Sequence, residues 1–190
     1  MEDAQIPPTD DQKKETAKIF KMGNILFIAC IIYMGATGGL CLTGTVNLAG
    51  RTTSLPNFAS RLEFTLKYLT LPLLWLLLLI FNIIINRGKT GALNPLAGRD
   101  MFFKKQSNIL QNSFEQFILS AFAQFILVSF LDEVWTLRII PWINFLFVIG
   151  RITFYLGYPI YRGFGMFLCL LSTTGMVGFA VYKFFEHLFF

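Results

Sequence analysis

The chain has 190 residues, of which 55% are hydrophobic and only 14% are charged. Soluble domains average roughly 45–50% apolar and about 25% charged residues, so this composition excludes a soluble fold, and it also excludes disordered and disulfide-rich classes. The net charge of +5 comes from bases that cluster beside hydrophobic runs, which favours membrane orientation over nucleic-acid binding.

The first twenty residues are polar and of mixed charge. Pro7 and Pro8 disfavour an early helix, and the segment lacks the basic start and apolar core of a signal peptide. We therefore expect residues 1–20 to form a polar segment on the cytosolic side. The first hydrophobic run is expected to remain as a membrane anchor.

Five apolar runs follow the polar segment, and each is long enough to cross a hydrocarbon core of about 30 Å, which takes roughly 17–25 helical residues. They lack the period-two alternation of a membrane barrel, so helices are the expected solution. We predict an all-α polytopic membrane protein. The runs cover residues 22–42, 65–85, 114–131, 139–158 and 164–185.

Glycine and proline positions give weaker expectations within these runs. Gly35 and Gly39 form a GxxxG spacing that lets helix backbones approach closely, although small residues are also common in membrane helices without such a contact. Pro72 and Pro141 are expected near helix starts, where proline is tolerated.

The distribution of bases predicts the orientation. With five crossings, eleven Lys and Arg residues lie on the side of the N-terminus and five on the other. The excess of cations on cytosolic loops predicts a cytosolic N-terminus and a lumenal or extracellular C-terminus. The second and fourth loops then face the cytosol.

Ionisable groups at membrane depth are expensive and are therefore candidates for function. Glu115 ends a polar stripe on one helical face, because its members follow spacings of three and four. The stripe favours a pocket near the cytosolic surface, and the alternative is a solvated helix end with a polar clamp between helices. Its members are Lys104, Asn108, Gln111, Asn112 and Glu115.

Arg151 is the second candidate, and it shares a helical face with Tyr155 and Tyr158. A guanidinium is a rigid fork for carboxylates, and tyrosine hydroxyls add neutral donors. An anionic ligand site is one interpretation, and an Arg151–Glu115 pair that locks two helices is the other. The two interpretations are compatible.

Cysteine and histidine offer little chemistry. Cys30, Cys41 and Cys169 lie in apolar runs without a CxxC spacing, which is typical of small buried hydrophobes. His187 is the only histidine, so we expect neither a His-based triad nor a metal site.

Two motifs resemble those of the MAPEG superfamily, the membrane-associated proteins in eicosanoid and glutathione metabolism. Asn112-Ser113-Phe114-Glu115 resembles its Asn-x-x-Glu motif, and the stretch from Arg151 to Gly157-Tyr158 resembles its Arg-x-x-Tyr-x-x-Gly-Tyr motif. The resemblance covers about residues 60–190 and implies a four-helix unit. Residues 21–59 then supply an extra transmembrane helix and loop.

The resemblance implies a homotrimer that binds glutathione between protomers near the cytosolic face, with a lipophilic small molecule entering from the membrane lipids. It assigns ligand binding to Asn112, Glu115, Arg151 and Tyr158, and we add Asn108, Gln111 and Tyr155 as neighbouring candidates.

The chain departs from the family motifs at positions that matter for chemistry. Phe154 replaces the motif tyrosine, and Asn108 stands where a basic residue is expected. Members similar to leukotriene C4 synthase carry a thiolate-supporting arginine at about Gly165, and here Arg162 is only nearby. These departures and the extra helix resemble the divergent mattrin-like branch.

Two functions stay open on this evidence. The favoured one is a non-catalytic role in membrane organisation or trafficking, with a vestigial glutathione-type site in an endomembrane such as the endoplasmic reticulum, Golgi or lysosome. The alternative is a glutathione-dependent transferase or peroxidase acting on lipophilic substrates, with Arg162 as its catalytic group. A transporter is disfavoured because no inverted repeat or broken-helix pair is evident.

Overall fold

The computed structural model describes residues 10–50, 54–90 and 103–189. Within them the chain forms five helices and no strand, as the apolar runs predict. They are α1 (Asp10–Leu42), α2 (Phe58–Thr90), α3 (Lys104–Phe130), α4 (Glu133–Gly157) and α5 (Gly163–Phe189). All five are long and apolar enough to cross a membrane, so the predicted all-α, polytopic class is confirmed.

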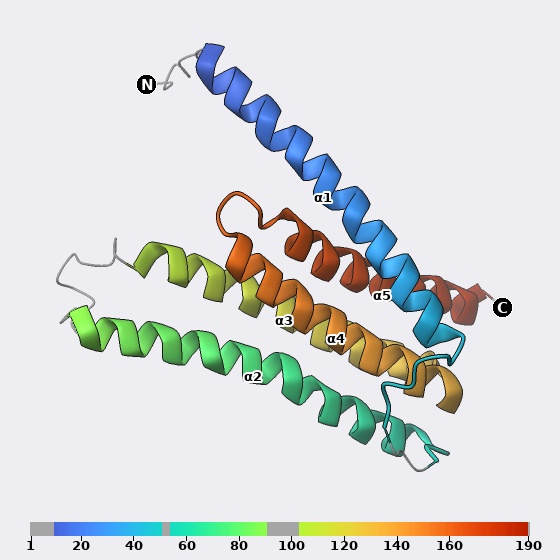
Figure 1. Cartoon of the computed structure of the whole chain (residues 1–190). Helices are drawn as coiled ribbons and strands as arrows, with labels where there is room; N and C mark the ends of the chain where they lie inside the picture. The colour runs from blue at the N-terminus through green and yellow to red at the C-terminus, as the bar shows by residue number, and fades with distance from the viewer. Residues whose placement is uncertain (1–9, 51–53, 91–102, 190) are drawn as a thin grey trace, which may run out of the picture.

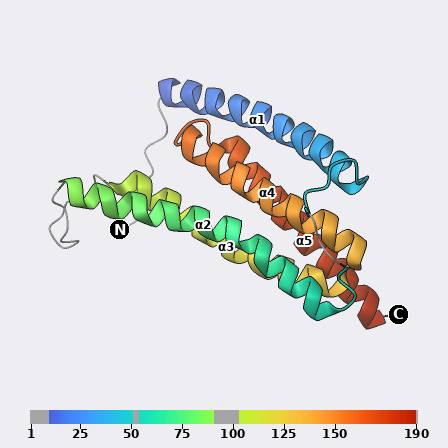
Figure 2. The same ribbon diagram turned by 60° about the horizontal axis from the view of Figure 1, so that its bottom comes forward.

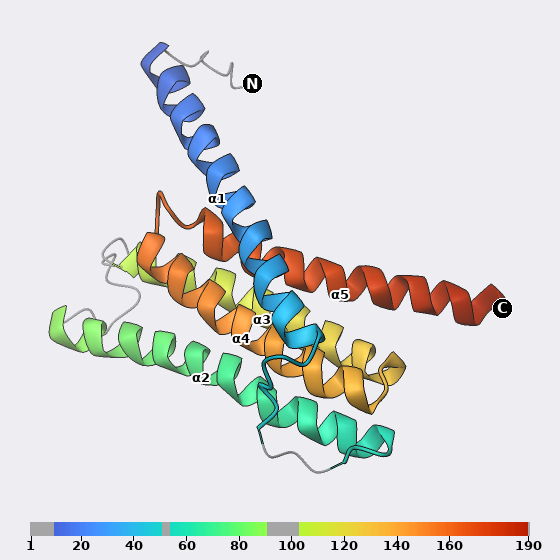
Figure 3. The same ribbon diagram turned by 45° about the vertical axis from the view of Figure 1, so that its right-hand side comes forward.

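Helices α2 to α5 form a four-helix bundle. Helix α2 packs against α3 and α4, and α5 packs against the same two helices from the other side. Helix α1 lies outside this unit, against α4 and α5 (Figure 1). Figure 3 shows its N-terminal half extending away from the bundle.

The connections divide between the two ends of the bundle. The start of α1, the end of α2, the start of α3 and the α4–α5 loop lie at one end (Figure 2). The end of α1 and the α3–α4 turn lie at the other end. This is the arrangement that five crossings require. Arg51 and Arg99 of the charge count, and residues 1–9 of the polar segment, lie outside the described residues.

The helices are longer than the apolar runs, which corrects the two expectations about proline. Helix α1 begins at Asp10, so it includes half of the expected polar segment. Pro72 and Pro141 lie inside α2 and α4 rather than near their starts. Proline is tolerated inside membrane helices because neighbouring groups satisfy the freed carbonyl.

Side-chain caps explain the early starts of α2 and α4. Asn57 Oδ1 accepts a 2.8 Å hydrogen bond from the Ser60 N–H, and Ser60 Oγ accepts one of 3.3 Å from the Asn57 N–H. Before α4, Asp132 Oδ1 accepts a 2.8 Å bond from the Trp135 N–H. Such caps satisfy backbone donors that would otherwise be unpaired at a helix start.

Glycine sets the closest approach in the bundle. A Cβ built on Gly165 of α5 would lie 2.1 Å from the Gly150 carbonyl oxygen of α4, and one on Gly150 would lie 2.6 Å from Cys169 Sγ. Only hydrogen fits between these backbones. The contact brings α5 close enough to α4 for Cys169 to reach the interior of the bundle.

Among the described residues, the GxxxG glycines make no close helix contact. Nothing lies within 4 Å of a Cβ built on Gly35 or Gly39, whereas one on Gly38 would lie 2.9 Å from the Trp142 ring. Trp142 Nε1 also donates a 3.1 Å hydrogen bond to Thr37 Oγ1. Helix α1 therefore docks on α4 through Thr37 and Gly38.

Candidate functional site

The polar face of α3 forms one wall of a cavity of about 310 Å³. The cavity lies at the end of the bundle that holds the start of α3 and the α4–α5 loop. Two further elements close it, the last turn of α4 and the first turn of α5. Its lining residues are Asn108, Gln111, Asn112, Glu115, Phe154, Tyr158, Arg162 and Met166.

Tyr158, which follows the last residue of α4, is surrounded by polar and cationic groups. Its hydroxyl accepts a long hydrogen bond of 3.5 Å from Asn108 Nδ2. The guanidinium carbon of Arg162 lies 5.3 Å from the centroid of the Tyr158 ring, and Lys105 Nζ lies 5.8 Å from it. Both distances allow cation–π attraction, so the ring holds positive charge at the rim of the cavity.

Arg151 lies behind the cavity wall and is fully buried. Its Nη1 donates a 2.8 Å hydrogen bond to Asn112 Oδ1, and its Nε donates one of 3.2 Å to Cys169 Sγ. The rings of Phe147 and Phe154 lie 5.5 and 5.1 Å from the guanidinium carbon. A charge at this depth is costly unless its donors are satisfied.

One donor of that guanidinium is not satisfied. Arg151 Nη2 is buried and has no hydrogen-bond partner among the described residues. Buried polar groups in proteins are hydrogen-bonded in the great majority of cases, so an unpaired one needs an explanation such as a bound ligand or water.

The Arg151–Glu115 pair is not formed, which corrects the sequence interpretation. Glu115 is exposed, and its Oε1 accepts a 3.0 Å hydrogen bond from Gln111 Nε2 on the same helix. Arg151 instead lies level with Asn112, three residues before Glu115. Glu115 and Arg151 lie near the same cavity, but Asn112 is the side chain that hydrogen-bonds to the guanidinium.

Tyr155 lies apart from the cavity. It is not among the lining residues, and its ring makes an edge contact with Trp75 of α2 at 6.1 Å. Its position on the shared face of α4 therefore directs it to a helix contact. The other candidates Asn108, Gln111, Asn112, Glu115, Tyr158 and Arg162 do meet around the cavity.

The position expected for a thiolate-supporting arginine is closed. Gly165 is buried against Gly150, and no side chain fits there. Arg162 is the cation of the α4–α5 connection that reaches the cavity lining. This arrangement makes Arg162 the only one of the sequence candidates for a cationic role that faces the cavity directly.

The sequence interpretation missed a buried amide cluster deeper in the bundle. Asn144 Nδ2 donates a 2.7 Å hydrogen bond to Gln124 Oε1, and Gln124 Nε2 donates one of 3.2 Å to Ser120 Oγ. All three side chains are buried. Two amides inside apolar runs were the available signal, because polar side chains at membrane depth commonly bond across helices.

Cys169 was also underestimated, since it was expected to be an inert hydrophobe. Its sulfur accepts the Arg151 Nε–H bond, and its S–H group faces the Phe147 carbonyl oxygen at 3.6 Å. The spacing of cysteines in the sequence contains no signal for this contact, which depends on the Gly150–Gly165 approach.

The cavity combines amide donors and acceptors, one carboxylate and one guanidinium. Such a set suits a small molecule that carries both carboxylate and amino groups. Within the described residues, no group of three or more His, Cys, Asp or Glu side chains could hold a metal ion.

The fold and the cavity are those of a polytopic, all-α integral membrane protein with a polar cavity at one end of its helix bundle. The MAPEG family model matches residues 65–182, more than half of the chain, and the protein belongs to the MAPEG family. The match begins within α2 and ends within α5, so it covers the four-helix unit and leaves α1 outside. Members of this family often bind glutathione and are commonly trimeric. No curated protein and no solved structure matches the chain.

Proposed function

We propose that this MAPEG protein binds a glutathione-type peptide in the polar cavity and acts without conjugation chemistry, in membrane organisation or trafficking. The observation that carries the binding proposal is the unpaired Nη2 of Arg151 behind a cavity lined by amide and charged side chains. A carboxylate is the acceptor that best matches an unsatisfied guanidinium donor.

The roles of the lining residues follow from their chemistry. Asn112 already accepts from Arg151, so its amide N–H₂ group is available to a ligand. Glu115 can accept from an amino group, while Asn108 and Gln111 can bond a peptide amide. Tyr158 contributes its hydroxyl, and Arg162 adds positive charge at the rim. Glutathione, when bound, would supply a thiol.

The assembly and orientation are part of the same proposal. We infer a homotrimer in which a neighbouring protomer covers the exposed side chains of Gln111 and Glu115. The excess of cations at the end of the bundle that holds the cavity supports a cytosolic position for it. The protein would lie in an endomembrane with its C-terminus in the lumen.

Two features support a non-catalytic role. Phe154 lines the cavity without the hydroxyl that the family motif places there. Gly165 leaves no room for a cationic side chain at the position where the resemblance implies a thiolate-supporting arginine. A thiolate needs a positive neighbour or a donor to be populated at neutral pH. Binding of the peptide needs neither the tyrosine hydroxyl nor the cation.

A glutathione-dependent transferase or peroxidase is the second candidate, and one observation favours it. Arg162 lines the cavity, so it could support a thiolate from the loop. A lipophilic co-substrate would then reach the cavity from the membrane lipids.

Calorimetry tests the binding proposal on the purified full chain in lipid nanodiscs. We expect glutathione to bind, and we expect Asn112→Ala to weaken it by about tenfold or more, the effect of losing a hydrogen bond to a charged group. Lys67→Ala is the matched control, because Lys67 lies on α2 at the other end of the bundle and is exposed. The absence of glutathione binding in folded, trimeric protein would reject the proposal.

Turnover separates the two candidates. The same preparation is supplied with glutathione and either an electrophilic lipid or a lipid hydroperoxide. Binding without turnover supports the non-catalytic role. Turnover that Arg162→Ala abolishes while glutathione still binds would establish the enzyme instead.

A further inference from the structure

A second cavity lies at the opposite end of the bundle from the polar one. It is a groove of about 420 Å³ between the end of α1 and helices α3, α4 and α5. Helix α1, which is outside the family's four-helix unit, contributes Met34 and Leu42 to this groove. Its lining includes Met34, Trp135, Trp142, Leu171 and Gly175.

The lining is almost wholly apolar, and the polar groups of Ser172 and Trp142 are already bonded. Ser172 Oγ donates to the Leu168 carbonyl oxygen at 2.9 Å, and Trp142 Nε1 donates to Thr37. A groove of this kind does not hold ordered water, which requires several polar partners. Its volume lies within the range of roughly 300–1,000 Å³ typical of sites for small apolar ligands.

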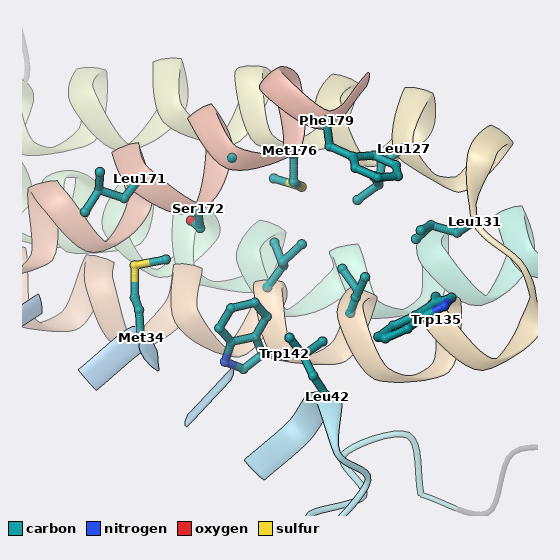
Figure 4. A pocket seen from close by; sticks show the side chains of 13 residues that line it. Met34, Leu42, Leu127, Leu131, Trp135, Trp142, Leu171, Ser172, Met176 and Phe179 are labelled. Atoms are coloured by element: carbon teal, nitrogen blue, oxygen red, sulfur yellow. The ribbon is translucent and has the colours of Figure 1, made fainter. Parts of the chain in front are cut away.

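The groove runs along the bundle from the middle of α5 to the first turn of α4. Leu171 and Met34 lie at one end, and Leu131 and Trp135 lie at the other (Figure 4). Trp135 is in the first turn of α4, next to the Asp132 cap, where tryptophan commonly marks the membrane interface. An elongated apolar molecule in the groove would therefore reach the headgroup level at the Trp135 end.

The Arg138 side chain lies near the Trp135 end of the groove. The guanidinium carbon of Arg138 lies 6.0 Å from the Trp135 ring, and Arg138 Nη1 donates to the carbonyl oxygen of Leu42, the last residue of α1. Trp135 and Leu42 both line the groove. Within the described residues, Arg138 has no carboxylate partner, so its charge is available to an anionic group.

Arg138 also lines a second, more polar cavity of about 270 Å³. It is formed by Gly44 and residues 46–50, which follow α1, and by Val134, Leu137 and Arg138 of α4. Gly44 has a φ of +80°, and a Cβ there would lie 3.0 Å from Arg138 Nη2, so glycine allows the chain to pass close to the guanidinium. Arg138 thus lines the polar cavity and also contacts two residues of the apolar groove, Leu42 and Trp135.

We propose that this composite site binds one phospholipid, with an acyl chain in the groove and the phosphate at Arg138. The apolar lining fits the acyl chain. The Arg138 guanidinium, which has no carboxylate partner among the described residues, fits the phosphate, for which arginine is well suited. The site is independent of the glutathione-type cavity. It also gives α1 a second means of attachment, because the lipid would contact α1, α4 and α5 together.

Native mass spectrometry of the delipidated full chain in detergent tests the proposal. The probes are palmitoyl-oleoyl-phosphatidylcholine and the diacylglycerol with the same acyl chains, which lacks the phosphate. We expect one phospholipid per protomer, held about tenfold more tightly than the diacylglycerol, as for one hydrogen bond to a charged group. Equal affinity for the two probes would overturn the proposal without any variant.

Two glycines of α5 provide a matched pair of variants. Nothing lies within 4 Å of a Cβ built on Gly175 or Gly178, but only Gly175 lines the groove. Gly175→Leu should lower phospholipid occupancy by about tenfold or more by filling the groove, whereas Gly178→Leu should leave it unchanged. Unchanged occupancy in Gly175→Leu would overturn the proposal. So would a lipid-free oligomer that Gly175→Leu dissociates, since a second copy would then cover the groove.

Discussion

Arg151 of α4 donates a 2.8 Å hydrogen bond to Asn112 of α3, and this bond links the buried charge of the protein to a wall of its polar cavity. Arg151 therefore contributes both to the stability of the bundle and to the proposed ligand site. A ligand that satisfies Arg151 Nη2 is therefore expected to raise the unfolding midpoint of the protein, because it binds the folded state alone.

Asn112→Ala should destabilise the bundle by about 1–3 kcal/mol, because it leaves Arg151 Nη1 buried without its acceptor. Chemical unfolding in detergent micelles measures the effect. Glu115→Ala is the control, since Glu115 is exposed and its bond from Gln111 is made within α3. A larger loss for Glu115→Ala than for Asn112→Ala would show that Glu115 is the true partner of the guanidinium.

Gly165→Ala should be strongly destabilising, by roughly 1–3 kcal/mol or more, because the new methyl group meets the Gly150 carbonyl oxygen. The same unfolding measurement applies. Gly178→Ala on the same helix has open space and should be neutral or slightly stabilising. Equal stability of the two variants would contradict the close α4–α5 contact.

The buried amides Gln124 and Asn144 should show an energetic coupling. Each single change to leucine leaves a buried partner with one bond fewer, while the double change removes both groups. Hydrogen bonds between membrane helices contribute about 0.6 kcal/mol on average and up to about 2 kcal/mol. A double-mutant cycle by unfolding should give a coupling in this range, and additive effects would mean that the two amides do not interact.

Gly38→Leu should detach α1 from the bundle, because the side chain would displace the Trp142 ring that rests on Gly38. Cys30 of α1 is fully buried and packs on Leu146 and Leu168, so its reaction with a maleimide reports the docking of α1. Peptide mapping should find Cys30 labelled in Gly38→Leu and protected in Gly39→Leu, where a Cβ meets nothing within 4 Å. Protection of Cys30 in both variants would place the docking contact elsewhere.

The number of helices and the fold class follow from composition, because a span of apolar residues in lipid has few alternatives to a helix. The positions of the helix ends do not follow from composition. Asn57 and Asp132 cap α2 and α4 well before the apolar runs begin, and a hydropathy pattern contains no information about those hydrogen bonds.

The polar cavity was predicted in outline, since helical spacing places Asn108, Gln111, Asn112 and Glu115 on one face of α3. The hydrogen-bond partner of Arg151 was not predicted, because Asn112 and Glu115 are less than one helical turn apart. The choice between them depends on the axial register of α3 and α4, which sequence spacing within either helix does not specify. The apolar groove depends in the same way on where α1 docks.

The contact between Gly165 and Gly150 also limits how this protein could evolve. A cation cannot arise at position 165 by a single substitution, because α4 and α5 would first have to move apart. A descendant that gained thiolate chemistry would have to draw its positive charge from the loop between these helices, where an arginine already stands at position 162.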